Sequence, residues 1–329
     1  MVKAMAAALR LVLNLSLAVL LVFVACVVLF SGFASVYLPM WETEPLGQGT
    51  DEGEWLWVDD QAIHYTTWGA RQDRPVVLIH GDMIEGSLSW GRVPSLLADA
   101  GTHVVAVDLL GYGRSSRVAE PVYSQRIQTR MLAHVLNEYG IQDATVVAHG
   151  RGAATALQLA VEQPQFIERI VLVSPCLADG EPLAWRTVAG IPYVGQAAAW
   201  ALRSGGPLWK SLRTGMVAST EAFPERYWRI AEVLGRIRGS AEAARMRVLS
   251  LPDDNLPEAI PGISVPVSVL LGDQDRTLSQ REAEALASQF IDASVQMLPG
   301  AGHLAQIDQP AAVVEAIAGS PGTDASLLP

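Results

Sequence analysis

Hydrophobic residues fill the N-terminal region almost without interruption, whereas the rest of the chain alternates between short apolar stretches and amphipathic ones. No charged residue occurs between Leu11 and Met40, and the segment from Leu11 to Phe30 consists almost entirely of Leu, Val, Ala and Phe. About 20 apolar residues are enough for a helix to cross the hydrocarbon core of a bilayer. We therefore expect residues 1–10 to be a cytoplasmic N-terminus and residues 11–38 to be a transmembrane anchor.

A cleaved secretory signal peptide is the competing interpretation of this segment, because Gly32-Phe33-Ala34 is compatible with a cleavage site. The apolar run is much longer than the usual ~7–15 residues of a signal peptide, which favours an uncleaved anchor. Lys3 and Arg10 precede the run, and the charged residues that follow it closely are acidic. The positive-inside tendency then predicts a single-pass protein whose C-terminal domain lies outside the cytoplasm.

Beyond a polar stretch at residues 39–53, which is expected to be a linker, the pattern alternates between strands and helices. The run from Pro75 to Ile79 is continuously apolar, as is typical of a strand buried on both faces of a sheet. Strands are expected at 55–58, 63–68, 75–79, 103–107, 145–148, 170–173, 267–271 and 294–298, and helices at 87–100, 123–139, 152–160, 279–290 and 309–318. This order predicts an α/β fold with a mostly parallel, doubly wound sheet.

The alternation stops over residues 178–263. This stretch is rich in aromatic residues, favours helices and contains no convincing parallel strand. We interpret it as a helical cap inserted into the sheet domain, whose two parts then cover residues 54–177 and 264–318. Residues 319–329 are expected to form a disordered tail.

Composition and charge argue against several classes of function. The chain has 329 residues, a net charge of −11 and two cysteines, one in the apolar N-terminal run and the other in the domain. It contains no recognised nucleic-acid-binding module, no glycine-rich phosphate loop and no group of Cys and His at the spacing of metal ligands. We therefore expect no cofactor, no metal and no nucleic-acid partner.

Four sequence motifs lie at the ends of expected strands. They are Val77-Leu78-Ile79-His80-Gly81-Asp82, Asp108-Leu109-Leu110-Gly111-Tyr112-Gly113-Arg114-Ser115, Ala148-His149-Gly150-Arg151-Gly152, and Gly272-Asp273-Gln274-Asp275 followed by Gly300-Ala301-Gly302-His303. In this order they resemble the motifs of the α/β-hydrolase superfamily, in its branch with a helical cap. The resemblance covers roughly residues 55–318 and implies the α/β-hydrolase fold.

The resemblance also implies where the reactive groups lie. A site of this kind combines a nucleophile, a histidine that takes up and returns its proton, and a carboxylate that orients the histidine. His303 matches the family's histidine and Asp275 matches its acid, whereas Asp273 is interpreted as a turn cap. The backbone N–H groups of Asp82 and Arg151 match the oxyanion hole.

Charged and basic side chains beside these positions need a separate interpretation. An acidic Asp82 is unfavourable next to a developing negative charge unless it is paired, and Arg151 is the partner that the sequence offers. His80 and His149 belong to their loop motifs, and we interpret both as structural.

Glycine occupies the position at which the family carries its nucleophile, because Gly150 is the central residue of the strand-to-helix elbow. Ser174 and Cys176 follow the strand at 170–173, at the same edge of the sheet, but neither lies on an elbow. Three hypotheses stay open. A dyad of His303 and Asp275 activates water or substrate directly, the protein is a catalytically dead module that binds a ligand, or it is a variant of an active serine hydrolase whose nucleophile was replaced.

The expected partners are a small apolar, ester-like or lipid substrate and the membrane. Residues 181–250 carry ten Lys or Arg against five Glu in an otherwise acidic chain. The simpler interpretation is a solvated helical face with aromatic residues inside. The alternative is that the cap contacts anionic headgroups through such residues as Arg236, Arg238, Arg245 and Arg247, in addition to the anchor.

Overall fold

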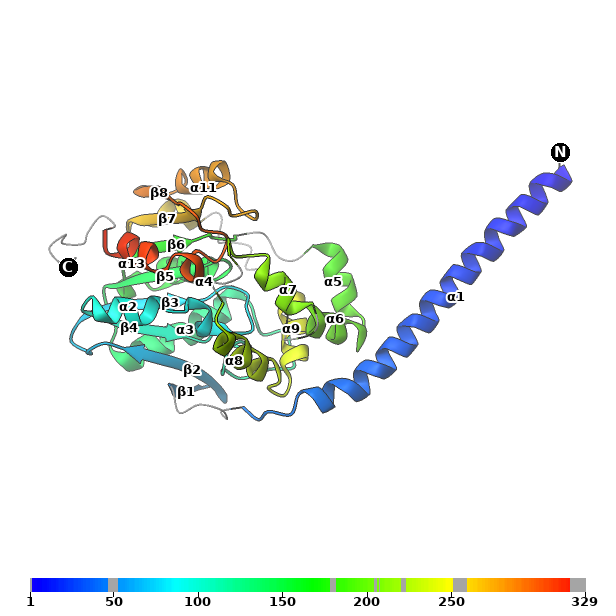
Figure 1. The fold of residues 1–329 in the computed structure, drawn as a ribbon, viewed down its shortest axis with the longest axis horizontal. Coiled ribbons are helices and arrows are strands. Elements are labelled where there is room, and N and C mark those ends of the chain that lie inside the picture. The colour runs from blue at the N-terminus through cyan, green and yellow to red at the C-terminus, as the bar shows by residue number, and fades with distance from the viewer. Residues whose placement is uncertain are drawn as a thin grey trace.

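An eight-stranded sheet forms the centre of the domain in the computed structural model (Figure 1), which describes residues 2–46, 53–177, 182–203, 206, 208–219, 223–250 and 259–319. The strands are β1 (Glu54–Val58), β2 (Gln61–Trp68), β3 (Arg74–Ile79), β4 (Thr102–Val107), β5 (Ala144–His149), β6 (Ile167–Val173), β7 (Val267–Gly272) and β8 (Ala293–Leu298). Their order is β1-β2-β4-β3-β5-β6-β7-β8. β1 and β2 form an antiparallel hairpin, β2 pairs antiparallel with β4, and all other neighbours are parallel, which confirms the predicted fold class.

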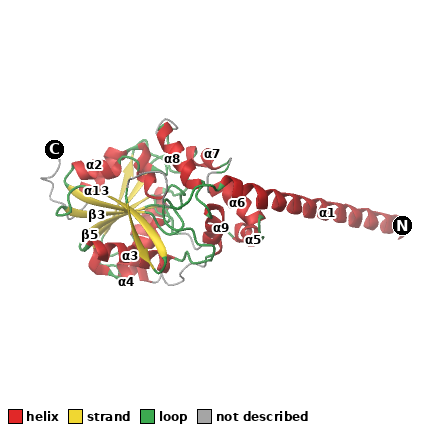
Figure 2. Ribbon diagram, turned by 90° about the horizontal axis from the view of Figure 1, so that it is seen from below, coloured by secondary structure: helices red, strands yellow, loops and turns green. Residues whose placement is uncertain are grey.

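Helices cover both faces of the sheet, as Figure 2 shows. They are α2 (Val93–Asp99) and α13 (Pro310–Gly319) on one face and α3 (Gln125–Tyr139) and α4 (Gly152–Glu162) on the other, with α11 (Gln280–Ala287), α12 (Ala305–Asp308) and the short 3-10 turns η1 (Gly86–Trp90), η2 (Pro164–Phe166) and η4 (Ile260–Gly262) in the connections. Two separate apolar clusters fill the space between sheet and helices, one on each face. Burial on both faces explains why the central strands are continuously apolar.

Side-chain caps set the ends of the helices more sharply than the apolar pattern does. α3 begins two residues later than expected, because the hydroxyl of Ser124 accepts a hydrogen bond from the backbone N–H of Ile127. It ends at Gly140, whose φ of 64° is left-handed. α11 begins with a capping box between Ser279 and Glu282.

The cap lies between β6 and β7 and consists of helices α5 (Leu183–Gly190), α6 (Val194–Arg203), α7 (Trp209–Thr214), α8 (Glu225–Gly235) and α9 (Ser240–Leu249). Its described residues contain no strand. An aromatic cluster formed by Trp209, Phe223, Tyr227 and Trp228 packs against Met83 and Ile84 of the loop after β3. This cluster holds the cap over the end of the sheet at which the parallel strands finish.

The N-terminal helix α1 (Val2–Trp41) extends far beyond the domain (Figure 1) and is long and apolar enough to cross a membrane. It continues through Pro39 into the stretch that was expected to be a linker, of which residues 47–52 lie outside the described residues. Near its C-terminal end, Ala34 and Leu38 are buried against Ala197 and Ala241 of the cap.

Hydrogen bonds fix this junction between α1 and the cap. The carboxylate of Glu42 accepts hydrogen bonds from the backbone N–H groups of Gly239, at 2.9 Å, and Ala241, at 2.6 Å, at the start of α9. The first-turn N–H groups of a helix have no partner within the helix, so an acceptor at this position stabilises α9. The end of the apolar helix is thus attached to the cap.

Candidate active site

Gly150 stands at the sharp turn between β5 and α4. Its φ is +52°, a left-handed conformation that glycine adopts without the steric cost that a Cβ imposes. The next glycine, Gly152, is required for a different reason, since a Cβ there would collide with the carbonyl oxygen of His80. The turn therefore lies tightly against the loop that follows β3, as expected for an elbow.

His303 and Asp275 are brought together from separate loops, after β8 and β7. The Nδ1 atom of His303 is 3.0 Å from Oδ2 of Asp275 and 2.7 Å from Oγ1 of Thr277. The Thr277 hydroxyl donates to Oδ1 of Asp275 at 2.7 Å, so it accepts the proton of Nδ1. This network assigns the Nδ1–H tautomer and leaves Nε2 of His303 as an acceptor facing the elbow.

The space above Gly150 is bounded by this imidazole. A Cβ placed on Gly150 would lie 3.8 Å from Nε2 of His303 and 3.7 Å from Cα of Gly81, both ordinary van der Waals separations. A small side chain therefore fits there, and an oxygen atom attached to that Cβ would come within hydrogen-bond reach of Nε2. The structure thus gathers Gly150, His303 and Asp275 around one point.

Burial and hydrogen bonding act in opposite directions on Asp275. Burial alone would raise the pKa of its carboxyl group, but the hydrogen bond from His303 and those from Thr277 outweigh burial and lower the pKa below its usual value. Asp275 is consequently ionised at neutral pH and can stabilise an imidazolium on His303. Asp273 accepts a hydrogen bond from the backbone N–H of Gly300 at 2.9 Å, in agreement with its interpretation as a turn cap.

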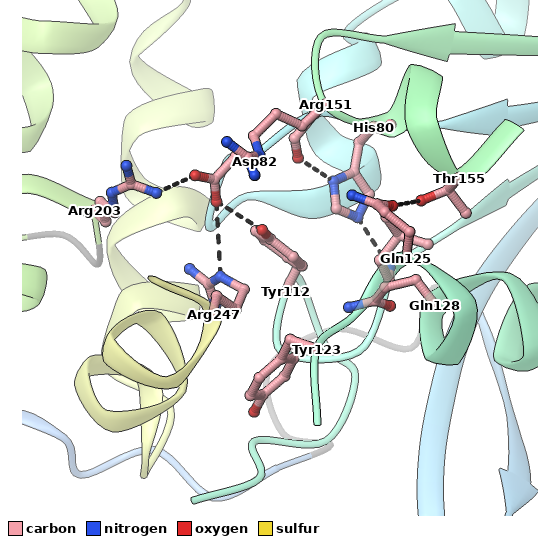
Figure 3. A pocket seen from close by; sticks show the side chains of 13 residues that line it. His80, Asp82, Tyr112, Tyr123, Gln125, Gln128, Arg151, Thr155, Arg203 and Arg247 are labelled. Atoms are coloured by element: carbon pink, nitrogen blue, oxygen red, sulfur yellow. Dashed lines mark hydrogen bonds and ion pairs between the residues drawn. The ribbon is translucent and has the colours of Figure 1, made fainter. Parts of the chain in front are cut away.

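The predicted oxyanion residues flank the same space. Arg151 is the residue before the first turn of α4, where backbone N–H groups carry partial positive charge, and Asp82 follows Gly81. The Asp82 side chain is held by its neighbours, as Figure 3 shows: Tyr112 donates to its Oδ1 at 2.6 Å, and Arg203 of the cap forms an ion pair with its Oδ2.

The charge of Asp82 is compensated mainly by the cap. Burial would raise the pKa of this carboxyl group, but Arg203, Arg247 and Arg151 together lower it below the ordinary value. The sequence indicated Arg151 as a partner, and Arg151 does help to lower this pKa, while Arg203 and Arg247 of the cap add ion pairs that the sequence did not indicate. No local signal in the sequence connects Arg203 with Asp82, since 121 positions separate them.

His80 and His149 have structural contacts. Nδ1 of His80 donates to the carbonyl oxygen of Gly81 at 2.6 Å, and Nε2 accepts from the backbone N–H of Leu109 at 2.9 Å. Nε2 of His149 donates to the carbonyl oxygen of His303 at 3.1 Å. Burial, together with the neighbouring His303, holds the pKa of His149 well below 6.5, so its ring is neutral and helps to position the loop of His303.

A cavity of about 890 Å³ opens over the elbow, between the core and the cap. Gly150 and His303 line its floor, and its walls include Leu177, Leu202, Leu212, Leu278 and Leu286. Cys176 also lines this cavity, and its backbone N–H donates to the carbonyl oxygen of Gly150 at 2.9 Å. Ser174 is buried at a left-handed φ of 44° and does not line this cavity.

The fold and this arrangement of loops place the chain in the α/β hydrolase family, and the model of that family matches residues 76–316. The chain is 25% identical over 266 residues to 3-oxoadipate enol-lactonase 2 of Acinetobacter baylyi, covering 80% of this chain and 94% of the relative.

Solved structures agree in fold. An α/β hydrolase fold protein from Burkholderia ambifaria is 25% identical, with a TM-score of 0.66 over 82% of this chain and 98% of its own. A membrane phospholipase A that is a bacterial virulence factor is 21% identical, with a TM-score of 0.63 over 93% of this chain and 94% of its own, a likeness of fold alone. The family resemblance stated from the four motifs is therefore confirmed.

Proposed function

We propose that this protein is a membrane-anchored hydrolase of an apolar, ester-like substrate, in which His303 and Asp275 activate a water molecule in the space above Gly150. The observation that carries the proposal is the position of Nε2 of His303, which faces that space while Nδ1 is held by Asp275. A group held in this way is a competent general base.

The reaction balances without a covalent intermediate. Water attacks the substrate carbonyl carbon while Nε2 of His303 takes one of its protons, and Asp275 stabilises the resulting imidazolium. The carbonyl oxygen becomes an oxyanion, which the backbone N–H groups of Asp82 and Arg151 hold. The C–O bond to the leaving group then breaks, and His303 returns the proton to the departing alkoxide.

The lining of the cavity supports an apolar substrate. Leucine side chains form much of its wall, and the charged side chains of Asp82, Arg203, Arg213 and Glu282 also line it. Pockets of this kind derive most of their affinity from apolar contact, and the placed polar groups orient the substrate. A medium-length acyl chain fits this description.

Membrane attachment rests on α1, whose apolar segment from Arg10 to Trp41 is exposed except near its C-terminal end, where Ala34 and Leu38 are buried against the cap. The cap, with its ten basic residues, contacts lipid headgroups through only some of them, because the side chains of Arg245 and Arg247 are 13% and 6% exposed. Arg238 is exposed, and Arg236 stacks over Trp41 at the end of α1. Headgroup contact is therefore proposed for Arg236 and Arg238. We also propose that the sheet domain lies outside the cytoplasm.

Two measurements test these proposals. The unaltered chain should hydrolyse short and medium p-nitrophenyl esters, and the activity should disappear in His303→Ala; a rate equal to that of buffer would contradict the water mechanism. Binding to anionic liposomes should weaken when Arg236 and Arg238 are reversed to Glu. Unchanged binding would limit membrane attachment to α1.

Gly150 supports two further candidate functions. Without a side chain at the elbow, the protein can be a binding module that retains the pocket, in which case a ligand binds tightly and no turnover occurs. The free space above Gly150 equally suits a serine hydrolase site from which the nucleophile has been removed. Restoring a hydroxyl at this position separates the two candidates.

A further inference from the structure

A second, smaller cavity of about 50 Å³ lies between the core and the cap, beside the main one (Figure 3). The two cavities share three lining residues, Asp82, Arg151 and Arg203. The lining of the small cavity is mostly polar and includes Tyr112 and Arg247. It therefore extends the apolar pocket by a polar recess close to the elbow.

Arg247 of α9 points into this recess with part of its hydrogen-bonding capacity unused. Its side chain is 6% exposed, its Nη1 donates to the carbonyl oxygen of Gly111 at 2.6 Å, and its guanidinium lies 4.0 Å from the ring centre of Tyr112. Within the described part of the chain, its Nε and Nη2 have no hydrogen-bond partner. A buried guanidinium with two nitrogen atoms that donate no hydrogen bond is unfavourable unless another group accepts from them.

The nearest carboxylate does not complete it. Oδ1 of Asp82 is 3.7 Å from Nε of Arg247, beyond hydrogen-bond distance, and already accepts the hydroxyl of Tyr112. The other oxygen of Asp82 is paired with Arg203. Both oxygens of Asp82 therefore have other partners, and Arg247 can still bind a further anion.

The recess has the size and the chemistry for a small oxyanion group. About 10–15 Å³ suffices for one water molecule, so the recess admits a group of a few heavy atoms. The planar guanidinium presents parallel N–H groups that match the oxygens of a carboxylate or phosphate. Arg151, which lines the recess, directly follows Gly150, so an anion held here lies close to the reacting bond.

We propose that Arg247 binds an oxyanion group of the substrate, a carboxylate or a phosphate, so that the hydrolysed compound is an amphipathic ester with one negative charge near the scissile bond. The part of this proposal that concerns the scissile bond rests on the proposed hydrolase function. Binding of the anion does not, because it requires no turnover.

Calorimetry on the full chain in detergent tests the site with glutarate and inorganic phosphate as probes. We expect one of the two to bind, Arg247→Met to weaken it at least tenfold, and Arg247→Lys to retain part of the affinity. Arg229→Met, which removes an exposed charge from the same cap, serves as the matched control. Preference for glutarate assigns the charge to a carboxylate-bearing substrate, and preference for phosphate assigns it to a phosphate-bearing one.

The proposal is overturned if neither probe binds the unaltered chain, or if Arg247→Met and Arg229→Met weaken binding equally. Should Arg247→Met not fold, Arg247→Gln keeps a polar side chain in the recess without the charge and gives the same comparison. A second readout is the ratio of kcat/KM for mono-p-nitrophenyl glutarate to that for p-nitrophenyl pentanoate, which should fall at least tenfold in Arg247→Met. If neither ester is hydrolysed, the proposed function fails, while calorimetry still decides the anion site.

Discussion

Replacing Gly150 with serine would place a hydroxyl between the elbow and His303. The new Cβ would meet Gly81 and His303 at ordinary separations, so no neighbour has to move. The φ of +52° is unfavourable for a residue with a side chain, and holding serine there costs about 1–2 kcal/mol. For a domain of this size, we expect the Tm to fall by roughly 2–8 °C.

The gain in activity should far exceed this loss of stability. A serine hydrolase that loses its nucleophile loses most of its rate, in one measured case on the order of 10⁶ in kcat. Because His303, Asp275 and the flanking backbone are already in position, we expect Gly150→Ser to hydrolyse p-nitrophenyl butyrate at least about 10³-fold faster than the unaltered chain. A burst of p-nitrophenol and labelling by a fluorophosphonate at residue 150 would identify the acyl-enzyme.

Gly150→Ala is the matched control, because it carries the same backbone strain without the hydroxyl. It should show the same fall in Tm and no gain in rate. Gly150→Ser with His303→Ala should lose the burst. The Gly150→Ser protein could fold, with its Tm in the expected range, and yet show neither burst nor label. That result would refute the view that His303 and the oxyanion loop are positioned to activate a nucleophile at residue 150.

The remaining predictions concern groups that hold this frame in place. Thr277→Val removes the hydroxyl between His303 and Asp275, and we expect kcat of the active form to fall about tenfold with little change in KM, measured alongside Thr277→Ser as the conservative control. Glu42→Ala removes the acceptor at the start of α9 and should destabilise the protein by about 0.5–2 kcal/mol, seen in denaturant unfolding; an unchanged midpoint would contradict the capping role. His149 has a pKa well below 6.5 when folded, so the unfolded chain binds the proton more readily, and stability present above pH 6.5 is lost as pH falls below it. His149→Gln should reduce that slope by up to one proton; the same slope in both proteins would show that His149 does not contribute.

The order of strands and helices follows from the apolar pattern because the parallel strands are buried on both faces. All eight strands lie where the pattern predicts them, and the errors are at their ends. β6 begins at Ile167, three residues earlier than expected. Arg169 interrupts the apolar run in sequence, but in the structure it is buried and donates to the carbonyl oxygen of Ile317 at 2.6 Å. A long-range partner of this kind leaves no mark in the local pattern.

The site divides in the same way. Short motifs with fixed backbone geometry bring Gly150, His303 and Asp275 together, because each lies in the loop that follows a strand of the sheet. Arg203 and Arg247 were not predicted as neighbours of Asp82, since they come from cap helices whose position depends on packing rather than on any motif. The side chain of Arg247 is buried in the recess, so Arg247 is left out of the headgroup contacts that we propose.

The attachment of α1 to the cap has a mechanical consequence. Glu42 and the buried Ala34 and Leu38 join the apolar helix to α6 and α9. If α1 spans a bilayer, the cap is therefore the fixed part of the molecule, held at a constant height above the lipid. Any widening of the cavity must then come from movement of the sheet domain away from the membrane. This is the reverse of a cap that lifts from a stationary sheet domain.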